Sequence, residues 1–111
     1  AGVPGSWNGS FQAVSPSFDL RTLSSGWHHI AYVGSGTTTT VYINGNNVGT
    51  IPVKITEAIR SVGNHFGSAQ SWGRTAEVAI YPSALSQTAI RNLASAAGCR
   101  TRPIFASDWY Y

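Results

Sequence analysis

The clearest alternation of side chains in this sequence begins at Trp27 and continues to Val33. Alternate residues of an extended strand point to opposite faces. One face would carry Trp27, His29, Ala31 and Val33, and the other His28, Ile30 and Tyr32. Because both faces carry apolar side chains, the pattern predicts a central strand that is covered on both sides. Residues 1–26 are interrupted by Gly, Ser and Pro and predict a loop with one or two short strands.

A hairpin is predicted directly after this strand. Residues 37–43 are all β-branched or aromatic, which favours a strand. The next two residues, Asn44 and Gly45, are a strong signal for a type I′ turn, since that turn needs a positive φ at both central positions. We expect the return strand to reach Ile51 and to end at Pro52.

Weaker strand signals and one helix follow. Residues 54–62 predict a weak strand, residues 63–73 a polar loop with aromatic side chains, and residues 74–81 another strand. A helix is predicted near 86–97, because Ser86 is a good N-cap and Gly98 stands where a helix would end. Its apolar stripe would consist of Ile90, Leu93, Ala94 and Ala97.

Two stretches of the chain carry a family resemblance. Residues 26–33 read GWHHIAYV and residues 41–45 read VYING, similar to the hairpin of laminin G-like domains in the concanavalin A-like lectin/glucanase superfamily. Residues 73–81, GRTAEVAIY, with ALS at 84–86, resemble the closing strand and helix start of the same family. The resemblance implies an all-β fold, an antiparallel jelly-roll-type β-sandwich with one short C-terminal helix. Ala76 and Ala89 replace the acidic residues of the family pattern.

The resemblance covers only the later strands of such a sandwich. We therefore divide the chain into an N-terminal segment 1–26, a laminin G-like sandwich and helix 27–98, and an apolar tail 99–111. Residues 1–25 are too short to supply all the upstream strands of the family. The chain is thus a minimal variant, a part of a longer polypeptide, or a fold that neighbouring subunits complete.

Composition and charge narrow the possible functions. Only 10% of the 111 residues are charged, and the net charge of +3 comes from cations scattered singly, which argues against nucleic-acid binding. No apolar stretch is long enough to insert into a membrane. The sole cysteine, Cys99, excludes an internal disulfide and is expected to be a small buried side chain. Abundant Ser, Thr, Gly and Asn are typical of secreted proteins and of virion surfaces, so we expect a location outside the cell.

The titratable residues argue against catalysis. Retaining glycosidases need two carboxyl groups about 5 Å apart. The chain has four carboxylates, no two within ten residues of each other, namely Asp19, Glu57, Glu77 and Asp108. We therefore expect no enzymatic activity and a structural role for Glu77, with a hydrogen bond to backbone or to an arginine.

Neither a metal nor another cofactor is expected. His28 and His29 are adjacent on a strand and point to opposite faces, so they cannot chelate one ion together. Calcium prefers several oxygen ligands with negative charge. The candidate oxygens of Asn44, Asn46 and Asn47 carry none. Calcium stays a weak alternative.

Ligand contacts are predicted in loop 63–73 and its flank. An aromatic ring can stack on a sugar while amide and guanidinium groups bond its hydroxyls. The predicted ligand-binding residues are Asn64, His65, Gln70, Trp72 and Arg74. The competing interpretation is that Trp72 fills the rim of the sandwich. A second, weaker candidate sugar-binding pair is Trp7 with Asn8.

The sequence thus predicts a non-catalytic extracellular binding or adhesion module that recognises glycan or protein surfaces, within a larger protein or assembly. The alternative is a structural protein that decorates or cements a virion or an extracellular filament. In either case we expect the chain to associate with itself or with other subunits, through a sheet edge and through its apolar C-terminal tail.

Overall fold

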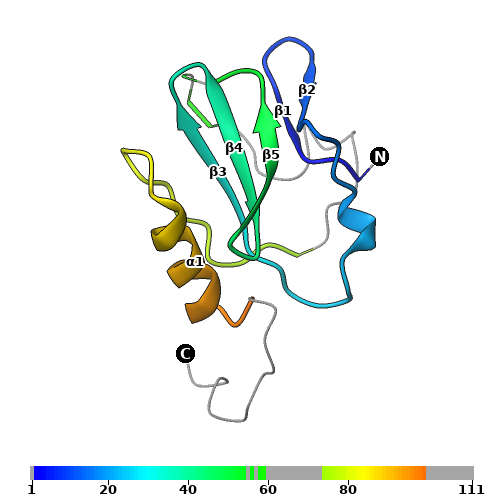
Figure 1. The fold of residues 1–111 in the computed structure, drawn as a ribbon, viewed down its shortest axis with the longest axis vertical. Helices are drawn as coiled ribbons and strands as arrows, with labels where there is room; N and C mark the ends of the chain where they lie inside the picture. Colours follow the sequence, from blue (N-terminus) through cyan, green and yellow to red (C-terminus); the bar gives the residue numbers. More distant parts are fainter. Residues whose placement is uncertain (1, 55, 57, 60–73, 100–111) are drawn as a thin grey trace.

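In the computed structural model of the chain, the described residues form two small antiparallel sheets, a short 3₁₀-helix (Leu20–Thr22) and one α-helix (Figure 1). It describes residues 2–54, 56, 58, 59 and 74–99. The first sheet is the hairpin of β1 (Gly5–Trp7) and β2 (Phe11–Ala13). The second contains β3 (Ile30–Ser35), β4 (Thr38–Ile43) and β5 (Asn46–Ile51) in the order β3-β4-β5. The expected fold class, an antiparallel β-sandwich with one short helix, is confirmed.

The turn between β4 and β5 forms as its sequence predicts. Asn44 has a φ of 52° and Gly45 a φ of 83°, so both central residues are left-handed. Gly45 also lies directly under Arg91, because a Cβ added there would come within 3.0 Å of the arginine Cγ. The turn therefore closes the hairpin and contacts the helix at the same place.

Helix α1 (Gln87–Ala96) is confirmed together with both of its ends. The Ser86 hydroxyl accepts a hydrogen bond from the Ala89 N–H at 3.2 Å, and Gly98 follows the helix with a φ of 72°. Ile90 and Ala94, from the predicted apolar stripe, are buried. The helix contacts β5, and the Arg91 Nε donates to the Gly45 carbonyl at 3.4 Å.

The core lies between the three-stranded sheet and the N-terminal segment. Val41, Ile43 and Ile51 project from β4 and β5 into this core, where Val14 covers them. Further side chains from the loops and strands pack around it, namely Val3, Phe18, Leu20, Leu23, Ile30, Val48 and Val53. Ser15 joins the layers through two hydrogen bonds with Thr50, of 2.7 and 2.9 Å.

Two strand predictions were wrong in detail, and a third lies largely outside the described residues. The strand expected from Trp27 starts at Ile30 and lies at the edge of its sheet, so the central strand is β4. Trp27 is accordingly exposed. The strand expected at 74–81 does not form, and Val78 and Ile80 face solvent. At the weak strand expected for 54–62, the described residues 54, 56, 58 and 59 belong to no strand.

A local reason accounts for part of the missing strand at 74–81. Glu77 has a φ of 57°, and this left-handed conformation interrupts the alternation of an extended chain. Glu77 is also exposed, and the hydrogen bond to backbone or to an arginine that we expect for it stays a prediction. The division of the chain at residues 26 and 98 stays a prediction. No helix in the described ranges is long and apolar enough to cross a membrane.

Candidate functional site

The ligand-binding residues predicted from the sequence fall mostly outside the described part of the structure. Asn64, His65, Gln70 and Trp72 belong to the stretch 60–73, which is not described. Arg74 is described and exposed at the start of the segment that leads to α1. The assignment of a site to this loop therefore stays a prediction.

A different group of aromatic side chains meets at the β1–β2 hairpin. Trp7 and Phe11 stand directly opposite each other across the two strands, on the same face of the hairpin. Their side chains are 56% and 54% exposed, respectively, although large apolar side chains usually lose most of their surface on folding. The turn between them consists of Asn8, Gly9 and Ser10, with Gly9 at a φ of 105°.

Gly5 brings a third aromatic residue to this pair. A Cβ added at Gly5 would lie 2.5 Å from the Phe11 Cζ, so the phenyl ring rests against the bare glycine backbone. The hydroxyl of Tyr32, on β3, also lies against the Gly5 backbone, and burial of that hydroxyl raises the pKa of Tyr32. We call Trp7, Phe11 and Tyr32 the aromatic patch.

Polar groups line the tip of the hairpin beside the aromatic patch. The Gln12 Nε2 donates one hydrogen bond to the Asn8 Oδ1 at 3.2 Å and another to the Ser10 Oγ at 2.7 Å. These bonds use both N–H groups of the Gln12 amide. Its Oε1 and the Nδ2 of Asn8 have no partner among the residues that the structure describes. The tip therefore offers one amide acceptor and one amide donor to a ligand.

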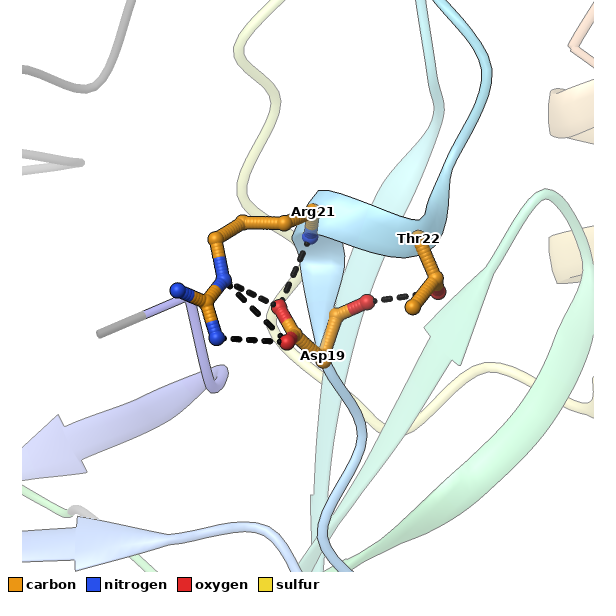
Figure 2. A network of polar contacts seen from close by, with 3 residues as sticks. All are labelled: Asp19, Arg21 and Thr22. Carbon is orange, nitrogen blue, oxygen red and sulfur yellow. Dashed lines mark hydrogen bonds and ion pairs between the residues drawn. The ribbon is translucent and has the colours of Figure 1, made fainter.

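Residues 2–18 around the patch carry no Asp, Glu, Lys, Arg or His. The nearest charges along the chain are Asp19 and Arg21, which neutralise each other (Figure 2). The Arg21 Nη2 donates to the Asp19 Oδ2 at 2.7 Å, and its Nε donates to both carboxylate oxygens. These bonds and one from the Arg21 N–H lower the pKa of Asp19 to about 2. The β1–β2 hairpin itself is thus uncharged.

The adjacent histidines bond to backbone and to the turn residue Asn44. The Nε2 of His28 donates to the Ser24 carbonyl at 2.7 Å, and its Nδ1 accepts from the Asn44 Nδ2 at 2.8 Å. The Asn44 Oδ1 accepts the His29 N–H at 2.9 Å. Burial lowers the pKa of His29. Both imidazoles are half-buried, as expected, but the two residues precede β3, so their placement on a strand was wrong.

Two of the three candidate calcium oxygens are already hydrogen-bonded. Asn44 uses its oxygen as just described, and the Asn47 Oδ1 accepts the Gly49 N–H at 2.9 Å. No group of three or more His, Cys, Asp or Glu side chains gathers within the described ranges. Cys99 is half-buried against the Trp27 carbonyl, and burial raises the pKa of its thiol.

Sequence reasoning ranked the hairpin below the later loop. The letters WNGSF at 7–11 did contain a signal, because two aromatic residues flank a short stretch that includes an Asn-Gly turn signal. The contact between Tyr32 and Gly5 carries no such signal, since 26 positions separate the two residues and only the packing of two sheets joins them.

Comparison with known proteins places this geometry in context. A family model described as the concanavalin A-like lectin/glucanases superfamily, of the laminin G type, matches residues 5–91. A 2.1 Å crystal structure of an S-layer domain-containing protein (residues 221–444) from Clostridium thermocellum ATCC 27405 is similar, with 30% identity and a TM-score of 0.48. The similarity covers 67% of this chain and 42% of that one. No curated protein matches.

Proposed function

This chain belongs to the laminin G-like family of the concanavalin A-like lectin/glucanases superfamily, and from that premise we propose that it is a non-catalytic carbohydrate-binding module. The proposed site is the aromatic patch together with the amides at the tip of the β1–β2 hairpin. The observation that carries the proposal is the pair of Trp7 and Phe11, side by side and more than half exposed.

The chemistry of this surface suits a neutral sugar. One face of a pyranose ring presents C–H groups, which pack on the flat face of an aromatic side chain. Its hydroxyls then need hydrogen-bond partners, and the Gln12 Oε1 and the Asn8 Nδ2 supply an acceptor and a donor. Residues 2–18 contain no charged side chain, so the hairpin itself does not select for an acidic or basic ligand.

A catalytic role has little support in the described residues. Asp19 is held by Arg21, and Glu77 is exposed on a segment without regular structure. A glycosidase would need two carboxyl groups facing one bond of the substrate. We therefore place the activity in recognition and the location outside the cell, on a surface where the chain forms part of a larger protein or assembly.

A glycan array, followed by calorimetry on the best ligand, tests this function. Trp7→Ala and Phe11→Ala should each weaken binding at least about tenfold, the usual loss on removing a central aromatic contact. Trp27→Ala is the matched control, because Trp27 is 60% exposed but lies outside the hairpin. All three variants should keep their thermal stability, since the removed side chains are mostly exposed.

A fourth variant, Trp72→Ala, separates this site from the one predicted in loop 63–73. If Trp72→Ala abolishes binding while Trp7→Ala leaves it intact, the loop is the site and the aromatic patch is not. If no neutral glycan binds the wild-type chain, the carbohydrate function itself is wrong.

One observation favours the alternative function, that of a structural subunit in a virion or an extracellular filament. Val78, Ile80 and Tyr81 are 60%, 69% and 48% exposed on one short segment. Apolar side chains that cluster on a surface often mark contacts with other proteins. Val78→Ser with Ile80→Ser should then block incorporation into an assembly and leave glycan binding unchanged.

A further inference from the structure

Two asparagines of the chain are followed directly by glycine, Asn8 and Asn44. Such a dipeptide can react with itself. The backbone nitrogen of the glycine can attack the side-chain Cγ of the asparagine, because a residue without a Cβ leaves the path to that carbon open. The two sites share the same dipeptide, so the structure around each one decides how far their reactivities differ.

Asn8 lies at the open tip of a short hairpin. The two strands that it joins, β1 and β2, form a separate sheet and have three residues each. Asn8, Gly9 and Ser10 are all exposed, and a Cβ built on Gly9 would meet no atom of the described residues within 4 Å. A hairpin of two strands is only marginally stable by itself. The tip can therefore change its backbone angles, as the attack requires, without unfolding the larger sheet.

The polar contacts of Asn8 leave the reacting atoms available. The Gln12 Nε2 donates a hydrogen bond to the Asn8 Oδ1 at 3.2 Å. This oxygen takes up negative charge when a nucleophile adds to Cγ, so a donor at that position does not oppose the reaction. The Asn8 Nδ2, which must leave, has no partner in the described part of the chain. The same is true of the attacking Gly9 N–H within those residues.

Asn44 is held in the opposite way. Its Nδ2 donates to the His28 Nδ1 at 2.8 Å, and its Oδ1 accepts from the His29 N–H at 2.9 Å. Gly45 is buried, and a Cβ added there would lie 3.0 Å from the Arg91 Cγ. An attack by the Gly45 nitrogen would need both side-chain bonds to break and the turn to shift against the helix.

We propose that Asn8 is a site of spontaneous deamidation and that the fold protects Asn44 from the same reaction. In the first step the Gly9 nitrogen forms a bond to the Asn8 Cγ, and the bond from Cγ to Nδ2 breaks. The Gly9 N–H proton leaves with Nδ2 as ammonia, and a cyclic succinimide remains. In the second step one water molecule opens the ring at either of its two carbonyl carbons. The products are aspartate and isoaspartate, and no oxidant or reductant takes part.

The reaction changes the hairpin in two respects. It places a negative charge within residues 2–18, which otherwise contain no charged side chain. Isoaspartate also adds one atom to the backbone between residues 8 and 9, inside the turn that holds Trp7 opposite Phe11. The hairpin therefore exists in an amide form and an acidic form, and the share of the acidic form increases with the age of the protein. This chemistry is independent of the sugar ligand proposed above.

Peptide mapping by mass spectrometry tests the proposal on the full chain, kept folded in mildly alkaline buffer. Cleavage after Arg21 and Lys54 separates the two sites, because residues 1–21 contain Asn8 and residues 22–54 contain Asn44. Asn8 should lose its amide at least about tenfold faster than Asn44, since the attack at Asn44 must first break two hydrogen bonds. In denaturant the two rates should become similar, because both asparagines then precede an unhindered glycine.

Gly9→Ala tests which nitrogen attacks, because the added methyl group hinders the approach to Cγ. It should slow deamidation of Asn8 several-fold and leave Asn44 unchanged. Gly36→Ala is the matched control, since Gly36 also has a positive φ and open space for a Cβ. Equal rates at the two sites of the folded chain, or a wild-type rate in Gly9→Ala, would overturn the proposal. So would a product that contains aspartate alone, because opening of a succinimide also gives isoaspartate.

Discussion

The side-chain amide of Asn44 donates a hydrogen bond to the Nδ1 of His28 across 2.8 Å, and this contact fixes the form of the imidazole. The His28 Nε2 bonds to a carbonyl oxygen, which only accepts, so the proton lies on Nε2. The Asn44 Oδ1 accepts a hydrogen bond from the His29 N–H, and a flip of the Asn44 side-chain amide would break this bond. The turn residue thus positions the imidazole of His28 just before β3.

Asn44→Asp should destabilise the fold by about 1–3 kcal/mol at pH 8, because it places an acceptor against the His28 Nδ1. Aspartate tolerates the left-handed conformation of residue 44 almost as well as asparagine, so backbone strain is not the cause. Urea denaturation at pH 8 measures this.

Asn46→Asp is the control for this substitution, because it makes the same change on an exposed residue of the same hairpin. An Asn44→Asp protein as stable as Asn46→Asp at pH 8 would show that the contact contributes nothing.

Acid should weaken the fold through His29. Its Nδ1 is buried without a hydrogen-bond partner in the described part of the chain, and burial lowers the pKa of His29 below 6.5. The unfolded chain therefore binds a proton at a pH where the folded chain does not. Stability should be constant above about 6.5 and should fall as the pH drops from there toward the lower pKa of the folded state.

His29→Leu should flatten this dependence of the unfolding free energy on pH. An NMR titration of the His29 ring in the folded protein should give a midpoint below 6.5. A midpoint at or above the ordinary value would contradict the prediction.

Gly49→Ala should destabilise the junction between the two layers by about 2–4 kcal/mol. Gly49 has a φ of 146°, and a Cβ there would lie 2.6 Å from the Ser15 carbonyl oxygen and 2.9 Å from the Val14 Cγ2. Gly36→Ala is the control, because Gly36 also has a positive φ but has nothing within 4 Å of its added Cβ. Thermal unfolding should show a clearly smaller loss for Gly36→Ala, and equal losses would mean that crowding at Gly49 is unimportant.

The carboxyl group of Asp19 should titrate at about 2 in the folded protein and closer to its ordinary 3.8 in the Arg21→Gln variant. Because the folded pKa is lowered, the stabilising contribution exists above about pH 3.8 and is lost as the pH falls toward 2. The loss of stability on substitution should be small, since the Arg21 side chain is 70% exposed. Carbon-detected NMR of the carboxyl group measures the shift, and Lys54→Gln should leave it unchanged.

Features set by neighbouring residues could be predicted from the sequence. The left-handed turn at Asn44 and Gly45 and the cap at Ser86 depend on the backbone preferences and short side-chain contacts of a few residues. The family resemblance rests on the same local signals, and it identified the fold class correctly. Trp7 and Asn8 were noticed as an aromatic ring beside an amide, and the hairpin that presents them is also a local feature.

The tertiary structure decided what lies next to what. The apolar residues on both faces of β3 predicted a central strand, but its place at the edge depends on which strands pair, and alternation does not encode that. The apolar pattern of 74–81 likewise did not make a strand, because a strand needs a neighbour to bond to. The meeting of Phe11 and Tyr32 at Gly5 required two sheets to pack together, and no spacing in the sequence could specify it.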